Sequence, residues 1–203
     1  MQSVPNATLV NTDVDPVVDP VVDIVIVSWN TQALTLNCLH SLRQELALHS
    51  IPAAVWVVDN NSADGTVESI RGKFGEFHLI VNGDNVGFAR ANNQAIPLGT
   101  APWVLLLNSD TVVPTGELRR LLEFATARSD VDVIGPKLIY ENGAPQTSVD
   151  TVTTPLAQLA YLVSFYFPPF DNQLRKWFRK RTLPRPSALA TTIGSTEIWT
   201  KAC

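Results

Sequence analysis

Five short apolar runs alternate with segments of helical period, which leaves few ways for this chain to fold. The runs are rich in β-branched and aromatic residues and have the length of strands. They cover Asp23–Trp29, Ala53–Asp59, Phe77–Asn82, Trp103–Asn108 and residues 132–139. Strands that are apolar almost throughout, with helices between them, predict a mostly parallel sheet covered by helices on both faces. The predicted fold class is therefore α/β, with right-handed crossovers between the strands.

The segments between the runs have apolar residues at helical spacing. They cover residues 31–46, 62–74, 85–96 and 115–128. Most of them begin next to a residue type that commonly caps a helix. The expected caps are Thr31 for the first helix, Ser62 or Asp64 for the second and Thr115 for the fourth, and Pro97 is expected to end the third.

Composition and charge limit the class of protein. A chain of 203 residues with 45% hydrophobic content can bury one sizeable core. The net charge of −4 gives no basic footprint, so we expect no nucleic-acid partner. The chain has two cysteines, no signal-peptide pattern and no apolar run of about 18 residues. These features argue against a disulfide framework and predict a cytoplasmic protein.

The sequence divides into three parts. Residues 1–22 are polar and contain Pro16 and Pro20 within the repeat DPVVDPVVD, which predicts a disordered or extended leader. The alternating runs occupy residues 23–147, and residues 148–203 form a tail of different character. The folded core is therefore expected within residues 23–147.

Loops rich in Asn, Asp, Ser and Gly follow four of the predicted strands. They are Ser28–Thr31, Asp59–Gly65, Asn82–Asn93 and Asn108–Asp110. Ligands of parallel sheets bind beyond the carboxyl ends of the strands, and these ends meet at one edge. A ligand site is therefore predicted at this edge. The alternative for any single loop is ordinary turn chemistry, because the same residue types suit turns and helix caps.

Asp110 follows the apolar run VLLL and is the sharpest candidate for a metal ligand. An uncompensated carboxylate is costly to desolvate, and a cation that prefers oxygen ligands, Mg²⁺ or Mn²⁺, would compensate it. Asn108 lies two residues earlier, so both side chains are expected on one side of an extended strand. Substrate phosphates would complete such a site. The alternative is that Asp110 only caps the turn before Pro114.

Two other loops carry candidates for the same site. Asp59 is placed to accept hydrogen bonds from the imide or amino edge of a nucleobase, or else it caps the helix that follows. Gly87 permits a close backbone approach at a helix start, which favours phosphate, or else it forms a tight turn. Asn92 and Asn93 face either a ligand or solvent.

Five segments share their order and spacing with a known family. They are IVIVSWNT, VVDNNSADGT, NVGFARANN, VLLLNSDTVV and VIGPKLIYENGAPQ. In this register they resemble glycosyltransferase family 2, most closely its rhamnosyltransferase-like members, over residues 23–147. The resemblance implies the Rossmann-like GT-A fold. It also implies inverting transfer of a sugar from a nucleotide-diphospho-sugar, with Mg²⁺ or Mn²⁺ as the cofactor.

The resemblance also implies roles for individual residues. Asp59 matches the acid that contacts the base. The tripeptide Asn108-Ser109-Asp110 matches the Asp-x-Asp-type motif, so Asp110 is expected to bind the metal and, through it, the diphosphate. Ser28 and Asn30 match the nucleotide edge of the first strand. The segment beside the donor is matched by Asn85, Gly87, Phe88, Asn92 and Asn93.

The tail departs from the family pattern. Family members continue through a general base, an Asp or Glu, whereas the acids after Gln146 are Asp150, Asp171 and Glu197, none of them in an acidic-pair motif. The chain thus resembles a C-terminally truncated member in which residues 148–203 are an incomplete acceptor region. We expect weak or absent transfer from it. The alternative function is a catalytically incomplete module that binds the nucleotide sugar.

Partners and location follow from the same resemblance. It implies a saccharide or lipid-linked acceptor and a role in cell-wall or polysaccharide biosynthesis, with rhamnose as one candidate sugar. Residues 155–185 are apolar and then basic, which suits a peripheral contact with the inner face of a membrane. The alternative for this segment is packing on the domain edge. A nucleotidyltransferase or dinucleotide oxidoreductase is disfavoured, because SWNTQAL lacks a Gly-rich loop.

Overall fold

The structure is a computed structural model that describes residues 7–10, 14, 17, 19–140, 143–146 and 197–200. The strands are β1 (Ala7–Leu9), β2 (Val22–Ser28), β3 (Ala53–Asp59), β4 (His78–Asn82), β5 (Trp103–Asn108), β6 (Thr111–Val112), β7 (Lys137–Tyr140) and β8 (Glu197–Thr200). The helices are α1 (Gln32–Leu48), α2 (Thr66–Lys73), α3 (Phe88–Ala95), the 3₁₀ turn η1 (Ile96–Leu98) and α4 (Glu117–Thr126).

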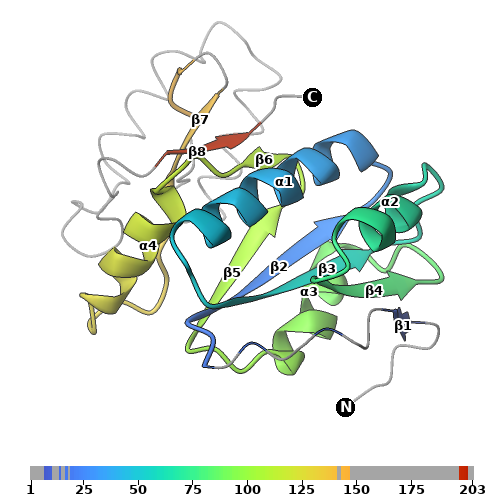
Figure 1. Cartoon of the computed structure of the whole chain (residues 1–203), viewed down its shortest axis with the longest axis horizontal. Helices are drawn as coiled ribbons and strands as arrows, with labels where there is room; N and C mark the ends of the chain where they lie inside the picture. The colour runs from blue at the N-terminus through green and yellow to red at the C-terminus, as the bar shows by residue number, and fades with distance from the viewer. Residues whose placement is uncertain are drawn as a thin grey trace, which may run out of the picture.

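The main sheet has the strand order β1-β4-β3-β2-β5 (Figure 1). Strands β4, β3, β2 and β5 are parallel, as the continuous apolar runs predict. Strand β1 pairs antiparallel with β4 at one edge, with Thr8 opposite Val81. Of the two alternatives for the leader, disordered or extended, these three residues are extended, because the free edge of β4 supplies them with backbone partners.

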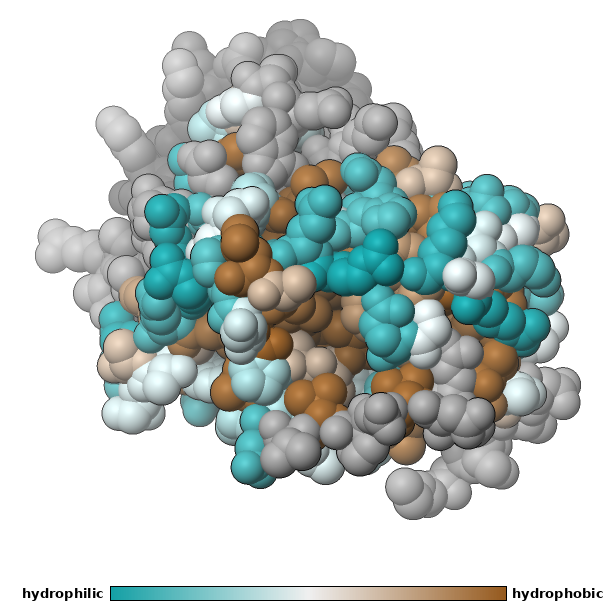
Figure 2. Space-filling view, in the orientation of Figure 1, coloured by the Kyte–Doolittle hydropathy of each residue, from teal (hydrophilic) through white to brown (hydrophobic). Residues whose placement is uncertain are grey.

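Helices cover both faces of the sheet, which confirms the predicted fold class (Figure 1). Helices α1 and α2 lie on one face, over a core that includes Ile24, Val57 and Leu79. Helix α3 lies on the other face, over a smaller core that includes Trp56. Figure 2 shows hydrophilic residues along the outer side of α1, and apolar residues below it over the strands. The helix thus separates the core from solvent.

Strand β5 is less covered than the prediction of two protected faces requires. Leu106 pairs in register with Val25, so its side chain lies on the α3 side of the sheet. Leu106 is 49% exposed and Val104, two residues before it, is 42% exposed. Among the described residues α3 therefore covers β2 and β3 and leaves this face of β5 open.

A second, smaller sheet has the order β6-β8-β7. The fifth predicted strand, residues 132–139, corresponds to β7 only in its second half and lies in this sheet, not in the main one. Helix α4 begins after Gly116 and not at a Thr115 cap, because Gly116 adopts φ +85°. The predicted membrane contact in residues 155–185 lies outside the described residues. In the part of the chain that is described, no helix has the length and apolarity to cross a membrane.

Candidate functional site

The carboxyl ends of the parallel strands lie level at one edge of the main sheet. Ser28, the last residue of β2, pairs with Asp59, the last residue of β3. On the other side of β2, Val27 pairs with Asn108, the last residue of β5. The structure therefore brings three of the predicted site residues to one edge, as the strand-end rule requires.

The loops after β2 and β3 are joined by hydrogen bonds from Asn30. Its side-chain Oδ1 accepts the Ala63 N–H at 2.8 Å, and its own N–H donates to Ser62 Oγ at 2.9 Å. Asn30 and Asn61 adopt the left-handed φ values +51° and +65°, which Asn tolerates better than most residues. The side-chain oxygen of Asn30, a predicted nucleotide contact, is therefore already used to connect the two loops.

Asp59 is fully buried and only half satisfied. Its Oδ1 accepts the Ser62 N–H at 2.8 Å, whereas its Oδ2 has no hydrogen-bond partner in the described part of the chain. Asp59 does not cap the helix that follows, because the N-cap residue of α2 is Gly65, and the Thr66 N–H donates to Asp64 Oδ1 at 3.2 Å. A buried polar atom without a partner costs about 1–3 kcal/mol, and in native structures such an atom calls for an explanation. A hydrogen-bond donor on a bound ligand would supply one.

The start of α1 is capped from the loop after β3. The Gln32 N–H donates to Asp64 Oδ2 at 2.8 Å, while Thr31, the predicted cap, makes no capping bond with its side chain. Burial acts to raise the pKa of the Asp64 carboxyl, but bonds from the Thr66 hydroxyl and from the Gln32 and Thr66 N–H groups outweigh it and lower the pKa. Asp64 therefore fixes two helix starts beside the edge.

Ser28 lies beneath the edge and not on its surface. The residue is fully buried, and its Oγ lies 2.8 Å from Thr35 Oγ1 and 3.3 Å from Thr31 Oγ1. Thr31 Oγ1 in turn lies 3.5 Å from Ser109 Oγ, in the predicted metal motif. This hydroxyl cluster connects the end of β2 with the turn after β5.

The metal motif differs from its prediction in geometry. Strand β5 ends at Asn108, Ser109-Asp110 form a turn, and β6 begins at Thr111. Asn108 and Asp110 therefore do not share one extended strand, so the alternation that was expected to place both side chains on one side does not apply to them. The turn closes with a hydrogen bond from Thr111 Oγ1 to the Asn108 carbonyl at 2.7 Å.

Asp110 is half-buried, and its carboxylate accepts no hydrogen bond and forms no ion pair among the described residues. This does not support the alternative that Asp110 only caps the turn before Pro114. Burial raises the pKa of the Cys38 thiol to about 12, the Thr111 hydroxyl opposes the rise, and the charge of Asp110 adds to it. The Asp110 carboxylate thus acts electrostatically on a thiol beneath the edge.

The donor set fits a cation that receives most of its ligands from elsewhere. Among the described residues, no group of three or more His, Cys, Asp and Glu side chains is arranged to bind a metal. A single free carboxylate on a turn matches Mg²⁺ or Mn²⁺ sites in which substrate phosphates and water supply the other oxygens. The residues present therefore fit the predicted cation only in the presence of a phosphate-bearing ligand.

The start of α3 exposes a short loop and an aromatic ring. Gly87 adopts φ +83°, and a Cβ at this position would meet nothing within 4 Å. Asn85 Oδ1 accepts the Gly87 N–H at 2.9 Å, and Phe88, the first helical residue, is 53% exposed. Gly87 is therefore required by its backbone conformation, and the space above it is open to a ligand.

The two adjacent asparagines of α3 have different environments. Asn92 is buried, donates from Nδ2 to the Phe88 carbonyl at 2.9 Å, and has a buried Oδ1 without a partner in the described structure. Asn93 is exposed. Exposure of Asn93 is compatible with both alternatives raised by the sequence, ligand and solvent, while Asn92 contributes to the packing of α3.

Other residues at the edge are not found by sequence reasoning. Asn82 donates to Asn60 Oδ1 at 2.9 Å and exchanges two hydrogen bonds with Gln94, at 3.0 and 2.8 Å. This buried amide network fixes α3 against the ends of β3 and β4. Its only sequence signal is an Asn just after one strand and another at the end of the next. Trp29, which follows β2, is 54% exposed.

The parallel sheet with helices on both faces and a polar carboxyl edge defines a Rossmann-like fold of the GT-A class. A family model described as "Glycosyl transferase family 2" matches residues 23–188. The chain belongs to this family. The family membership that the sequence motifs predict is thereby confirmed.

Three solved structures of S. aureus TarS share the fold. TarS 1-349 aligns with a TM-score of 0.52 and 22% identity over 66% of this chain and 41% of that one. The complex of TarS 1-349 with UDP aligns with a TM-score of 0.52 and 23% identity, over 65% of this chain and 41% of that one. A third TarS structure aligns with a TM-score of 0.52 and 22% identity, over 63% of this chain and 23% of that one. The chain thus spans less than half the length of these structures. No curated protein matches.

Proposed function

We propose that this chain binds a nucleotide-diphospho-sugar at the carboxyl edge of its main sheet and belongs to an inverting glycosyltransferase. The observation that carries the proposal is a pair of carboxylates at this edge, Asp59 after β3 and Asp110 after β5, each with an oxygen that has no partner among the described residues. One is suited to a hydrogen-bond donor and the other to a cation. The TarS structure with UDP supports the choice of ligand, because it has the same fold.

Asp59 and its surroundings suit the nucleobase end of the donor. The unpaired Oδ2 of Asp59 can accept an N–H from a base, and the loop that carries Asp59 is fixed by its own bond to Ser62. Trp29 exposes more than half of its surface near the same edge and offers a flat ring for stacking. Phe88 offers a second exposed ring at the start of α3. These features favour a planar, hydrogen-bonding ligand group.

Asp110 suits the diphosphate end through a bound cation. When present, Mg²⁺ or Mn²⁺ would neutralise the charge that develops on the leaving diphosphate. The role of the chain is to present the Asp110 carboxylate on a short turn, with the turn closed by Thr111. Gly87 leaves room at the start of α3, where backbone N–H groups favour phosphate. Asn108 is exposed beside the turn and is proposed to contact the donor.

The remaining features of the reaction are also proposals. Inversion requires a general base for the acceptor hydroxyl, and the acids after Gln146 give no acidic-pair motif that identifies it. The second candidate function is therefore nucleotide-sugar binding without transfer. We further propose a thymidine-diphospho-rhamnose donor, a saccharide or lipid-linked acceptor and a place at the inner membrane face. Flotation with anionic vesicles tests the membrane contact.

Incubation of the full chain with a panel of nucleotide sugars, Mn²⁺ and saccharide acceptors tests the proposal. The expected result is metal-dependent binding of at least one nucleoside diphosphate. When acceptor is added to the nucleotide sugar, nucleoside diphosphate should be released slowly or not at all. Rapid acceptor-dependent release would show that a base is present and would overturn the binding-only candidate. Absence of nucleoside diphosphate binding, with and without metal, would overturn the proposed function itself.

A further inference from the structure

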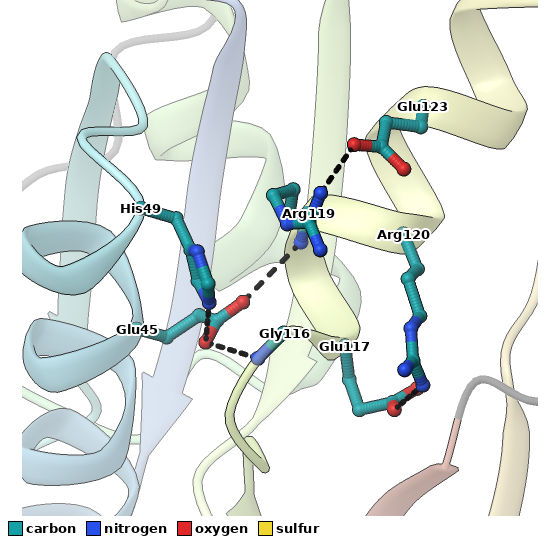
Figure 3. Close-up of polar contacts among 7 residues, drawn as sticks. All are labelled: Glu45, His49, Gly116, Glu117, Arg119, Arg120 and Glu123. Carbon is teal, nitrogen blue, oxygen red and sulfur yellow. Dashed lines mark hydrogen bonds and ion pairs between the residues drawn. The ribbon is translucent and has the colours of Figure 1, made fainter.

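A buried carboxylate of α1 caps the start of α4 (Figure 3). The side chain of Glu45 is fully buried, and it accepts the Gly116 N–H at 2.6 Å and the Arg119 N–H at 3.3 Å. Its Oε2 also lies 3.5 Å from His49 Nε2. The first N–H groups of a helix have no partner within the helix, and a carboxylate there is favourable. A neighbouring helix therefore provides the cap that α4 itself lacks.

Two further side chains on the same side of α1 contact the chain upstream of this cap. Ser41 Oγ accepts the Val113 N–H at 3.0 Å and donates to the Cys38 carbonyl at 2.8 Å. Cys38 Sγ lies 3.6 Å from the Asn108 carbonyl and 3.7 Å from Thr111 Oγ1. The contacts follow the chain in order, from the end of β5 to the first turn of α4.

Cys38, Ser41 and Glu45 form what we name the α1 polar stripe. They are three and four residues apart, so they lie on one face of the helix. Apart from the Cys38 carbonyl and His49 Nε2, their partners are Thr111 Oγ1 and backbone groups in residues 108–119. Helix α1 is long and packs on the core, with Cys38 and Glu45 both buried. It therefore holds in place the segment between β5 and α4, whose only regular structure is the two-residue strand β6.

We propose that the α1 polar stripe is a positioning device for Asp110. The Asp110 carboxylate has no partner of its own among the described residues, so its place depends on the backbone on either side. The stripe contacts that backbone just before Asp110, at Asn108, and again just after it, at Val113. The inference rests on the proposed function, because the cation role of Asp110 belongs to that proposal.

The competing account is that the stripe only stabilises the fold. The two accounts differ in what a mild change does to metal binding. A positioning residue alters the affinity for Mn²⁺ in the presence of nucleotide and leaves metal-free nucleotide binding unchanged. A residue that only adds stability lowers the unfolding midpoint and leaves both affinities alone.

Ser41→Ala in the full chain tests the proposal with two readouts. The first is hydrogen exchange of the backbone amides of residues 109–113 and 115 without metal, which we expect to accelerate about fivefold, the effect of one lost hydrogen bond. The second is calorimetry of uridine diphosphate with and without Mn²⁺, in which only the metal-dependent affinity is expected to fall by a similar factor. Thr126→Ala, which removes a hydroxyl bonded within α4, is the matched control and is expected to change neither.

Glu45→Gln and Glu45→Ala extend the test to the other end of the stripe. The side-chain amide of Gln keeps one hydrogen-bond acceptor. The amide exchange rate and the metal-dependent affinity of Glu45→Gln should therefore lie between the values of the original chain and those of Glu45→Ala. Glu123→Ala, which removes an exposed carboxylate paired with Arg119 at 2.8 Å, should leave both unchanged.

The outcomes separate the two proposals. Unchanged exchange in residues 109–113 and 115 of Ser41→Ala, or faster exchange with unchanged Mn²⁺ affinity, would overturn the positioning role. Failure of the original chain to bind nucleotide with Mn²⁺ would overturn the proposed function and, with it, the cation role of Asp110. Exchange would then still report whether the stripe orders the turn.

Discussion

At the scale of single residues, Asp59 joins a structural contact and a candidate ligand contact in one carboxylate. One oxygen accepts the Ser62 N–H at 2.8 Å, and the other is buried without a partner in the described structure. The first contact fixes the loop after β3, and the second is available to a base. The two roles are separable, because an amide can replace one oxygen and keep the other.

Asp59→Asn is expected to weaken nucleotide binding about tenfold and to leave the free energy of unfolding unchanged within about 1 kcal/mol. Asn keeps an oxygen for Ser62 but places an NH₂ group where an acceptor is needed. Calorimetry with uridine and thymidine diphosphates and urea unfolding measure the two effects. Equal nucleotide affinity in the variant would show that Asp59 serves only the turn.

Sequence position predicts some of these residues better than others. Asp59 and Asp110 are found because a carboxylate directly after an apolar run must lie at the strand-end edge. Ser28 also ends a strand and lies on the same face of the sheet as Asp59, but its hydroxyl lies 2.8 Å from Thr35 Oγ1 beneath the edge. Glu45 gives no signal, because its partner Gly116 is 71 positions away along the chain.

At the scale of elements, the connection from α3 to β5 depends on a close approach between Gly99 and Asp23. Asp23 lies on β2, is almost fully buried, and accepts the Ala101 N–H at 2.8 Å. A Cβ on Gly99 would lie 2.1 Å from Asp23 Oδ2. The backbone of Gly99, at φ −77°, is one that any residue adopts, so the constraint is purely one of space.

Gly99→Ala is therefore expected to destabilise the fold by about 3 kcal/mol, because the Asp23 carboxylate must move and lose its backbone donor. Gly72→Ala is the matched control. Gly72 lies in α2 with nothing within 4 Å of an added Cβ, so Ala should stabilise by about 0.5–1 kcal/mol. Urea unfolding of both variants measures the contrast. Equal stability of the Gly99 variant would show that Asp23 is free to move.

The elements themselves differ in how well the sequence predicts them. Ala53–Asp59 and Trp103–Asn108 are predicted to the residue, because each parallel strand is apolar almost along its whole length, although only the first is mostly buried. Strands β1 and β6, of three and two residues, carry no periodic pattern. They form because a sheet edge or a neighbouring strand offers them backbone partners, which depends on the tertiary structure.

At the scale of the whole molecule, the buried Cys38 thiol makes stability depend on alkaline pH. Burial raises its pKa to about 12 in the folded chain, against an ordinary value of 9.0. Between these values the unfolded chain releases the thiol proton and the folded chain keeps it. The free energy of unfolding therefore falls as the pH rises above about 9, by about 1 kcal/mol at pH 10 from this group alone.

Comparison with Cys38→Ala isolates this contribution. The variant has a lower stability at pH 8, since it leaves a small cavity, but its loss of stability between pH 8 and pH 10 should be smaller by about 1 kcal/mol. Urea unfolding under reducing conditions at both values measures the difference. Parallel pH profiles would mean that the thiol titrates alike in the folded and unfolded chains.

The central claim for the molecule is that its strand-end edge binds a nucleoside diphosphate through Asp110 and a cation. Calorimetry of uridine and thymidine diphosphates, with and without Mn²⁺, on the original chain and on Asp110→Ala tests it directly. We predict that Mn²⁺ tightens binding to the original chain about tenfold, equal to about 1.4 kcal/mol, and that the variant loses this gain but keeps its metal-free affinity. The same Mn²⁺ gain in both chains would contradict the claim.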